Sequence, residues 1–168
     1  IIRNHYVGRT FIEPTQQIRS LGVKLKHSIN KTLIKNKSLI LIDDSLVRGT
    51  TSVKIIKMLY ESGAKEVHLR IASPPIKYPD YYGIDTPTKN ELLAAKLNLE
   101  GMRKFINATT LQFLSIEGLY KSMGYEKRNS SYPQFTDHCF TGEYPVKLID
   151  ANDKNFGEDQ LSFMSSKS

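Results

Sequence analysis

Two adjacent carboxylates followed by a hydroxyl-rich loop are the residues of this chain best suited to do chemistry. Asp43 and Asp44 end an apolar run. The chain then continues with Ser45, Leu46, Val47, Arg48, Gly49, Thr50 and Thr51. Carboxylates accept hydrogen bonds from sugar hydroxyls or bind a hard cation such as Mg²⁺. Hydroxyls and backbone N–H groups suit a phosphate. The string therefore predicts a site for a sugar phosphate.

The segments around the loop predict how it is held. Leu39 to Ile42 is a continuous apolar run, typical of a strand buried on both faces of a parallel sheet. After Gly49, apolar residues recur at helical spacing until Gly63, which suits a helix end. Glu66 to Ile71 then alternates polar and apolar residues, as a second strand would. This strand–loop–helix–strand order predicts a βαβ unit, in which ligands bind beyond the carboxyl ends of strands.

A plainer interpretation of the acid pair also exists. Asp-Asp-Ser at a strand end can be a turn with helix-capping residues and nothing more. The order of strand, acid pair, hydroxyl, glycine, two threonines and helix agrees with the sugar-phosphate interpretation at every position. We therefore favour a binding site.

The rest of the chain predicts further elements. Before the motif we expect a helix over 14–21 and a strand over 23–26. After the second strand, residues 72–87 should be irregular. An amphipathic helix should open at Thr88, followed by another through Ile106, a strand over 111–114 and a helix over 116–123. The inner residues expected in the two middle helices are Leu92, Leu93, Ala95, Leu97, Leu99, Met102, Phe105 and Ile106. Residues 125–134 should form a loop, and the polar stretch from Ala151 should fray.

The string from Leu41 to Thr51 resembles the phosphoribosyl pyrophosphate (PRPP) motif of type I phosphoribosyltransferases. More narrowly, residues 1–150 resemble the glutamine PRPP amidotransferase (amidophosphoribosyltransferase) family. Matching segments are 4–12, 19–25, 63–68, 73–76, 82–86, 113–119 and 139–145. The resemblance implies an α/β fold with a parallel sheet flanked by helices, incomplete at its N-terminal side, and a helical C-terminal extension.

The resemblance also implies roles. Asp43 and Asp44 would hold the ribose hydroxyls and Mg²⁺, and residues 45–51, with Ser45, Val47, Arg48, Gly49, Thr50 and Thr51, would bind the 5′-phosphate. Tyr6 to Phe11 would begin a flexible catalytic loop, in which Arg9 would meet the charge of departing pyrophosphate. The implied reaction forms phosphoribosylamine from PRPP and glutamine-derived ammonia, the first step of de novo purine synthesis.

The resemblance further implies that this chain is a C-terminal part of such an enzyme, because the family begins with a glutaminase domain. We expect a partial transferase domain over 1–124 and a partly irregular tail over 125–168. The fragment alone would be inactive. Its partner would be a separately encoded glutaminase half, and the complete enzyme would be a homo-oligomer. A non-catalytic PRPP-binding regulator and a decayed remnant are the alternatives.

Some members of the family hold an iron–sulfur cluster on four cysteines. In this chain Asp80 and Thr136 stand where two of them are expected, and only Cys139 remains. One thiolate does not hold such a cluster, so we predict none.

Composition sets broad limits. The chain has 168 residues, one Cys and a formal net charge of +7. One Cys provides no disulfide framework, and no apolar run approaches the length of a membrane span. We expect a cytoplasmic protein without a membrane partner. The excess of lysine indicates a solvated surface more than attraction of a polyanion, and nucleic acid is not favoured as a partner.

Overall fold

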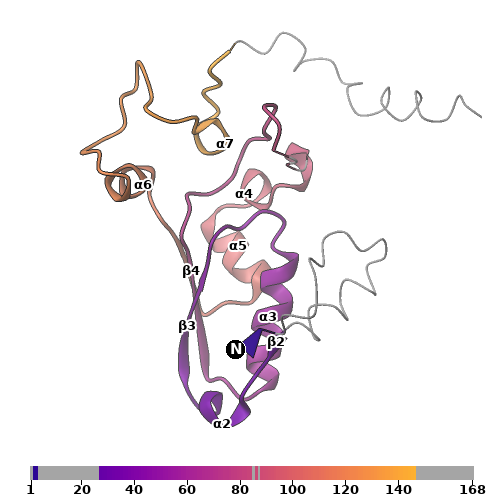
Figure 1. The fold of residues 1–168 in the computed structure, drawn as a ribbon. Helices are drawn as coiled ribbons and strands as arrows, with labels where there is room; N and C mark the ends of the chain where they lie inside the picture. Colours follow the sequence, from indigo (N-terminus) through magenta and orange to yellow (C-terminus); the bar gives the residue numbers. More distant parts are fainter. Residues whose placement is uncertain (1, 4–26, 85, 87, 147–168) are drawn as a thin grey trace, which may run out of the picture.

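A three-stranded parallel sheet forms the centre of the computed structural model, which describes residues 2–3, 27–84, 86 and 88–146 (Figure 1). Its strands are β3 (Ser38–Asp43), β4 (Glu66–Ile71) and β5 (Thr110–Phe113), in that spatial order. Leu41 pairs with Leu69, and Leu69 with Leu111. Separately, β1 (Ile2–Arg3) and β2 (His27–Ser28) form a short antiparallel pair. The predicted βαβ unit is confirmed.

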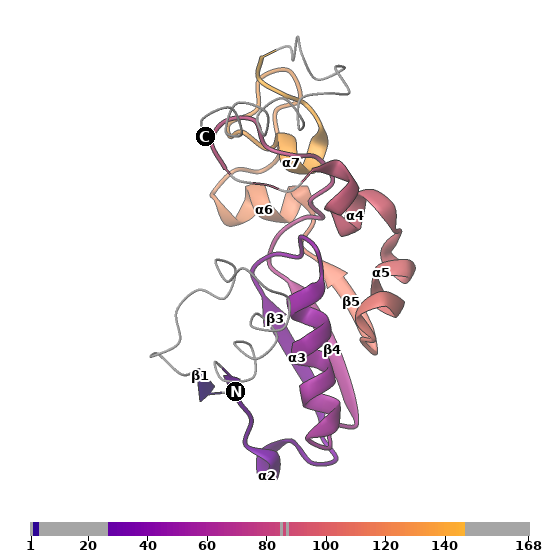
Figure 2. The same ribbon diagram turned by 90° about the vertical axis from the view of Figure 1, so that its right-hand side faces the viewer.

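The longest described helices pack on one face of this sheet (Figure 2). They are α3 (Thr50–Glu61), which joins β3 to β4, and α5 (Leu99–Ile106), which precedes β5. The shorter helical segments are α2 (Lys31–Ile34), η2 (Lys89–Glu91), α4 (Leu93–Lys96), α6 (Ile116–Ser122) and α7 (His138–Thr141). Figure 2 shows α6 and α7 beyond the carboxyl end of the sheet.

The core lies between the sheet and these two helices. Alternate residues of β4 point into it, which explains the polar–apolar pattern of that strand. The buried side chains include Ile56, Leu59, Val67, Leu69, Ile71, Met102, Ile106 and Leu111. Helix α3 ends as predicted: Gly63 has φ +94°, its N–H bonds the C=O of Tyr60, and the next N–H, of Ala64, bonds the C=O of Leu59.

Strand β3 differs from the prediction of burial on both faces. Its outward-facing Ile40 and Ile42 are 70% and 72% exposed, while Leu39 and Leu41 pack against the core. The strand lies at one edge of the sheet, and the helices of the described ranges cover only the opposite face. A continuous apolar run predicts a buried strand, and here half of that apolar surface faces outward.

The helix expected from Thr88 is also wrong in part. It breaks into η2 and α4, because Leu92 adopts an extended conformation between them. The N–H of Leu93 bonds the C=O of Val47 at 2.9 Å, outside its own segment. Leu92 and Leu93 are buried as expected, whereas Leu99 and Phe105 are about half exposed.

The other predicted helices, strands and loops are confirmed or lie outside the described residues. Strand β5 and helix α6 fall within one residue of their predicted bounds, and the described parts of 72–87 and 125–134 carry no helix or strand. The elements predicted over 14–21 and 23–26, the tail after 151 and the residue Arg9 are not among those described. No described helix has the length and apolar character needed to cross a membrane.

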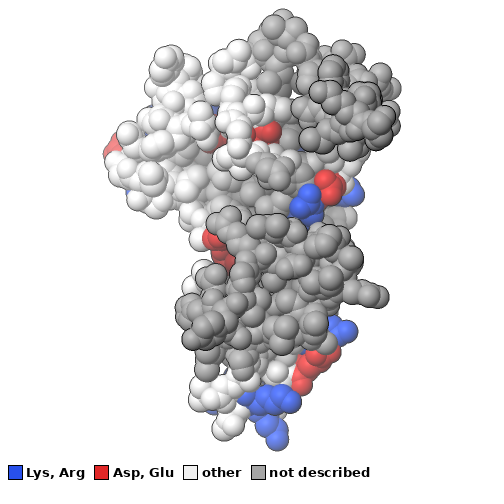
Figure 3. All heavy atoms as spheres, turned by 45° about the vertical axis from the view of Figure 1, so that its right-hand side comes forward, with Lys and Arg blue, Asp and Glu red and all other residues white. Residues whose placement is uncertain are grey.

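On the face in Figure 3, basic side chains gather at the end that holds α2, beside acidic ones.

Candidate functional site

The two adjacent carboxylates lie at the carboxyl end of β3. The C=O of Asp43 accepts a hydrogen bond from the N–H of Ala72 at 2.9 Å, so the sheet stays paired to this point. The Asp43 Oδ1 atom accepts the N–H of Asp44 at 3.1 Å, and Ser45 Oγ donates to Asp44 Oδ1 at 3.2 Å. Asp44 is exposed, and Asp43 is partly buried. Asp43 therefore belongs to the paired end of the strand, and the Asp44 carboxylate is the one exposed at the surface.

Helix α3 begins immediately after the loop and receives no side-chain hydrogen bond at its N-cap. That cap is Gly49, at φ +75°. The first N–H groups of a helix have no partners within the helix, and they carry its positive dipole end. In contrast, Asn98 caps α5 by accepting the N–H of Gly101, and Ser115 caps α6 by accepting the N–H of Gly118. The start of α3 thus suits an external anion.

Gly49 is required at this turn for two reasons. Its positive φ is unfavourable for residues with a Cβ atom. A Cβ built there would also lie 2.8 Å from Leu93 Cδ2 and 3.2 Å from Phe105 Cε1. The close contacts at Gly49 are with side chains of α4 and α5, which pack against the loop.

Arg48 forms the main charged contact of the loop. Its Nε donates to Glu91 Oε1 at 3.2 Å, and its Nη2 donates to Oε2 at 3.4 Å. Both side chains are about half exposed, at 50% and 49%. The hydrogen bond from Arg48 is the largest influence on Glu91 and holds its pKa below the ordinary value. Sequence reasoning missed this pairing, since 43 residues separate the partners.

Two carboxylates at a strand end fit the needs of one cation type. Mg²⁺ usually takes one or two protein carboxylates and completes its shell with water and substrate phosphate oxygens. Asp43 and Asp44 offer that donor set. Within the described residues there is no group of three or more His, Cys, Asp or Glu side chains that could enclose a metal. Two carboxylates would suit Mg²⁺ only where water or other oxygens complete its shell.

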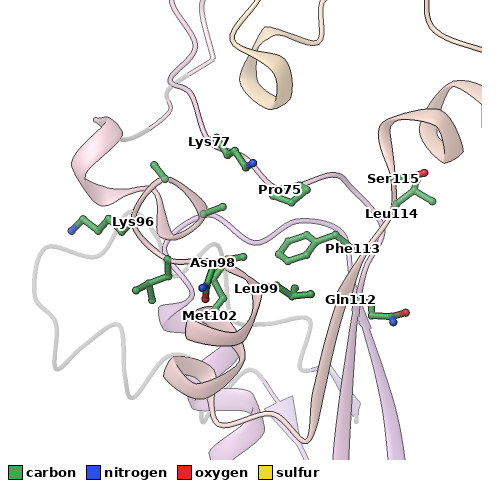
Figure 4. Close-up of a pocket in the computed structure, with 13 residues that line it drawn as sticks. Pro75, Lys77, Lys96, Asn98, Leu99, Met102, Gln112, Phe113, Leu114 and Ser115 are labelled. Atoms are coloured by element: carbon green, nitrogen blue, oxygen red, sulfur yellow. The ribbon is translucent and has the colours of Figure 1, made fainter.

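A groove with a volume of about 890 Å³ lies beside the loop after β4 (Figure 4). Figure 4 shows Pro75 and Phe113 directed into it, with Lys77 above. Helices α4 and α5 supply the opposite wall, from Ala94 to Met102. None of the predicted site residues that the structure describes, Asp43 to Thr51, lines this groove, and no sequence pattern indicated it.

A second polar cluster lies in the segment around α6 and α7. Asp137 accepts hydrogen bonds from Arg128 and from the hydroxyls of Tyr120 and Thr141. Burial opposes ionisation of Asp137, but the bonds from Arg128 and Tyr120 outweigh it and hold its pKa below the usual value. Asp80 Oδ2 lies 2.6 Å from His138 Nε2, and the two side chains are only 5% and 4% exposed. Burial raises the pKa of the neighbouring Cys139 thiol, which favours the neutral form.

The structure thus gathers all the described predicted residues, Asp43 through Thr51, at one turn between β3 and α3. The fold and this turn define the class: an α/β protein with a parallel three-stranded sheet that matches solved PRPP amidotransferases. One is glutamine PRPP amidotransferase from Bacillus subtilis, solved with ADP and GMP. It has a TM-score of 0.74 and 47% identity over 89% of this chain and 33% of that chain. A structure described as the allosteric regulatory enzyme of purine biosynthesis matches with the same TM-score.

The chain is a homologue of amidophosphoribosyltransferase. It is 59% identical to that of Rhizobium etli over 167 residues, which are 99% of this chain and 34% of the relative. It is 50% identical to a chloroplastic form from Arabidopsis thaliana over 94% of this chain and 27% of the relative. No family model matches the chain. The chain thus covers only part of these curated relatives, from 27% to 34% of their length.

Proposed function

We propose that this chain is the PRPP-binding portion of an amidophosphoribosyltransferase, which forms 5-phosphoribosylamine from PRPP and glutamine-derived ammonia in purine biosynthesis. The observation that carries the proposal is the continuity of the acid pair, the hydroxyl loop and the helix end without a side-chain cap. A phosphorylated pentose has hydroxyls and a phosphate a few ångströms apart, and this turn offers a matching group for each.

The loop would hold the 5′-phosphate at the start of α3. Backbone N–H groups of the first helical turn donate to phosphate oxygens, and the hydroxyls of Ser45, Thr50 and Thr51 lie along the same stretch of chain. Asp43 and Asp44 would accept hydrogen bonds from the ribose hydroxyls. These bonds would fix the orientation of the sugar relative to the loop.

Mg²⁺ fits the same carboxylates, and when bound it neutralises charge that develops on departing pyrophosphate. Asp43 and Asp44 would hold it together with oxygens of PRPP. Arg9, which lies outside the described residues, is our candidate for a second cation facing the pyrophosphate. The source of ammonia and the remaining part of the pyrophosphate site would come from a glutaminase-bearing portion outside these 168 residues.

The test is calorimetric titration of the chain with ribose 5-phosphate and with Mg²⁺–PRPP. We expect saturable binding of both, and loss of Mg²⁺-dependent PRPP binding in the double variant Asp43→Asn/Asp44→Asn. The matched control is Glu61→Gln/Glu126→Gln, which removes two exposed carboxylates away from the turn and should bind as the parent does. PRPP binding that survives in the Asp43→Asn/Asp44→Asn variant would overturn the site. Absence of binding by the parent chain would favour a remnant without function.

A further inference from the structure

A backbone hydrogen bond joins the loop proposed to bind phosphate (residues 45–51, the phosphate loop) to a segment more than 40 residues further along the chain. The N–H of Leu93 donates to the C=O of Val47 at 2.9 Å, and this bond takes the place of a helical one at the η2–α4 break. Leu46 beside it is 2% exposed. The first half of the loop is thus fixed to the segment formed by residues 88–93.

A side-chain contact joins the same two segments a few residues away. Glu91 receives two hydrogen bonds from Arg48 through Nε and Nη2. It also lies within 3.5 Å of the Thr88 hydroxyl, and its own N–H bonds the Thr88 C=O at 2.8 Å. Contacts with Thr88 in its own segment therefore restrict the Glu91 carboxylate, in addition to its bonds with Arg48.

The third contact is packing beneath the turn. Leu93 lies against Gly49 so closely that a Cβ atom would collide with it, as described above. Lys89 of the same segment lies over the ring of Tyr78, 5.5 Å from its centroid, which links the segment to the loop after β4. Backbone, charge and packing contacts therefore come from one short segment and reach the loop at three successive residues, 47, 48 and 49.

We propose that residues 88–93 are a splint for the phosphate loop and that Glu91 is a positioning residue, which acts through Arg48 on binding of the sugar phosphate. This inference rests on the function proposed above. An acid beside an anion site weakens binding by simple repulsion. A carboxylate tied to Arg48 by two hydrogen bonds instead restricts the guanidinium and the loop that carries it, and this reduces the ordering needed when the phosphate binds.

The first experiment measures amide hydrogen exchange of the unliganded chain, so it does not depend on ligand binding. In Glu91→Ala we expect faster exchange at residues 46–52, with an unchanged melting temperature. The matched control is Glu61→Ala, which breaks the exposed pair between Lys57 and Glu61 on α3 and should leave exchange in the loop unchanged. Exchange in the loop that is unaltered by Glu91→Ala would overturn the splint.

The second experiment asks whether Glu91 acts through Arg48. Exchange is compared in Arg48→Ala, Glu91→Ala and the double variant. Positioning through the guanidinium predicts that Glu91→Ala adds nothing once Arg48 is removed. If Glu91 only organises its own turn through Thr88, the two effects add, and that result would contradict the assignment.

The third experiment measures affinity for ribose 5-phosphate by calorimetry. We expect Glu91→Ala to bind about ten-fold more weakly, the order of one hydrogen-bonded contact to a charged group. Tighter binding would mean that Glu91 acts as a repelling charge, and unchanged binding that it has no effect on the ligand; either result would overturn the positioning role. If the parent chain does not bind ribose 5-phosphate, the proposed function fails, while the exchange measurements still decide the splint.

Discussion

Two polar regions of this molecule contain the same kinds of side chain but differ in whether those side chains are bonded within the protein or exposed to solvent. Around α6 and α7, Asp137 is enclosed by Arg128, Tyr120 and Thr141, so its hydrogen-bonding capacity is taken up inside the protein. At the turn after β3, Asp44 is exposed and the N-cap of α3 receives no side-chain hydrogen bond. The comparison teaches that density of charge does not mark a site. What distinguishes the turn after β3 is that Asp44 is accessible from outside.

The largest expected effect is acid destabilisation of the enclosed region. The folded pKa values of Asp80 and Asp137 lie below the ordinary value of 3.8. Their stabilising contribution is present above that pH and is lost as the pH falls below it toward the folded pKa values. Chemical unfolding at pH 7, 5, 4 and 3 should show the free energy of unfolding falling most between the last two. Asp80→Asn should flatten that fall, and an equal slope in the variant would refute the link.

Removal of Arg128 should be the most costly single substitution in the enclosed region. Arg128→Ala leaves the buried Asp137 carboxylate without its cation, and we expect a loss of about 3–5 kcal/mol in the free energy of unfolding. Lys57→Ala breaks an exposed pair and should cost less than about 1 kcal/mol. Urea titration compares them. A loss below about 1 kcal/mol in Arg128→Ala would show that the cluster is not a structural centre.

At the open turn, Gly49→Ala should cost about 2–4 kcal/mol of stability. The positive φ contributes about 1–2 kcal/mol and the contact with Leu93 adds the cost of overpacking. Gly124→Ala is the matched control, because Gly124 has φ +88° with open space around its Cβ position. The difference between the two midpoints in urea isolates the packing contribution. Equal losses would mean that α4 does not support the turn.

The smallest pair of effects separates binding from capping. Thr50→Val should weaken binding of ribose 5-phosphate by about 1–3 kcal/mol through loss of a hydroxyl partner, with little change in stability. Ser115→Ala removes the cap of α6 and should cost about 1 kcal/mol of stability with binding unchanged. Calorimetry and thermal melting distinguish them. Both variants behaving alike would argue that α3 and α6 begin in equivalent ways.

Local patterns predicted the central elements because the physics behind them is local. The alternation over Glu66–Ile71 gave the bounds of β4, and Gly63 gave the end of α3, since backbone geometry there depends on neighbouring residues. The acid pair and loop of the candidate site were predicted in the same way. The exposed face of β3 was not, because burial depends on what packs against a strand.

Contacts between distant segments left no trace in the sequence. Arg48 pairs with Glu91, which lies 43 positions further along the chain. Asp80 pairs with His138, which lies 58 positions further along. Nothing in their spacing predicts either, because the fold of the intervening chain brings them together. The break at Leu92 has the same cause: the Leu93 N–H bonds the C=O of Val47, in the loop after β3, which lies outside the local pattern.

Residues 43–51 are proposed to bind a phosphorylated pentose. Titration of the ¹⁵N-labelled chain with ribose 5-phosphate, followed by backbone amide shifts, tests it most directly. We expect saturable shifts concentrated in residues 44–52, with none of comparable size at Asn98 or Ser115, whose side chains cap their own helices. Shifts centred on the groove beside Phe113, with the turn after β3 unperturbed, would contradict it.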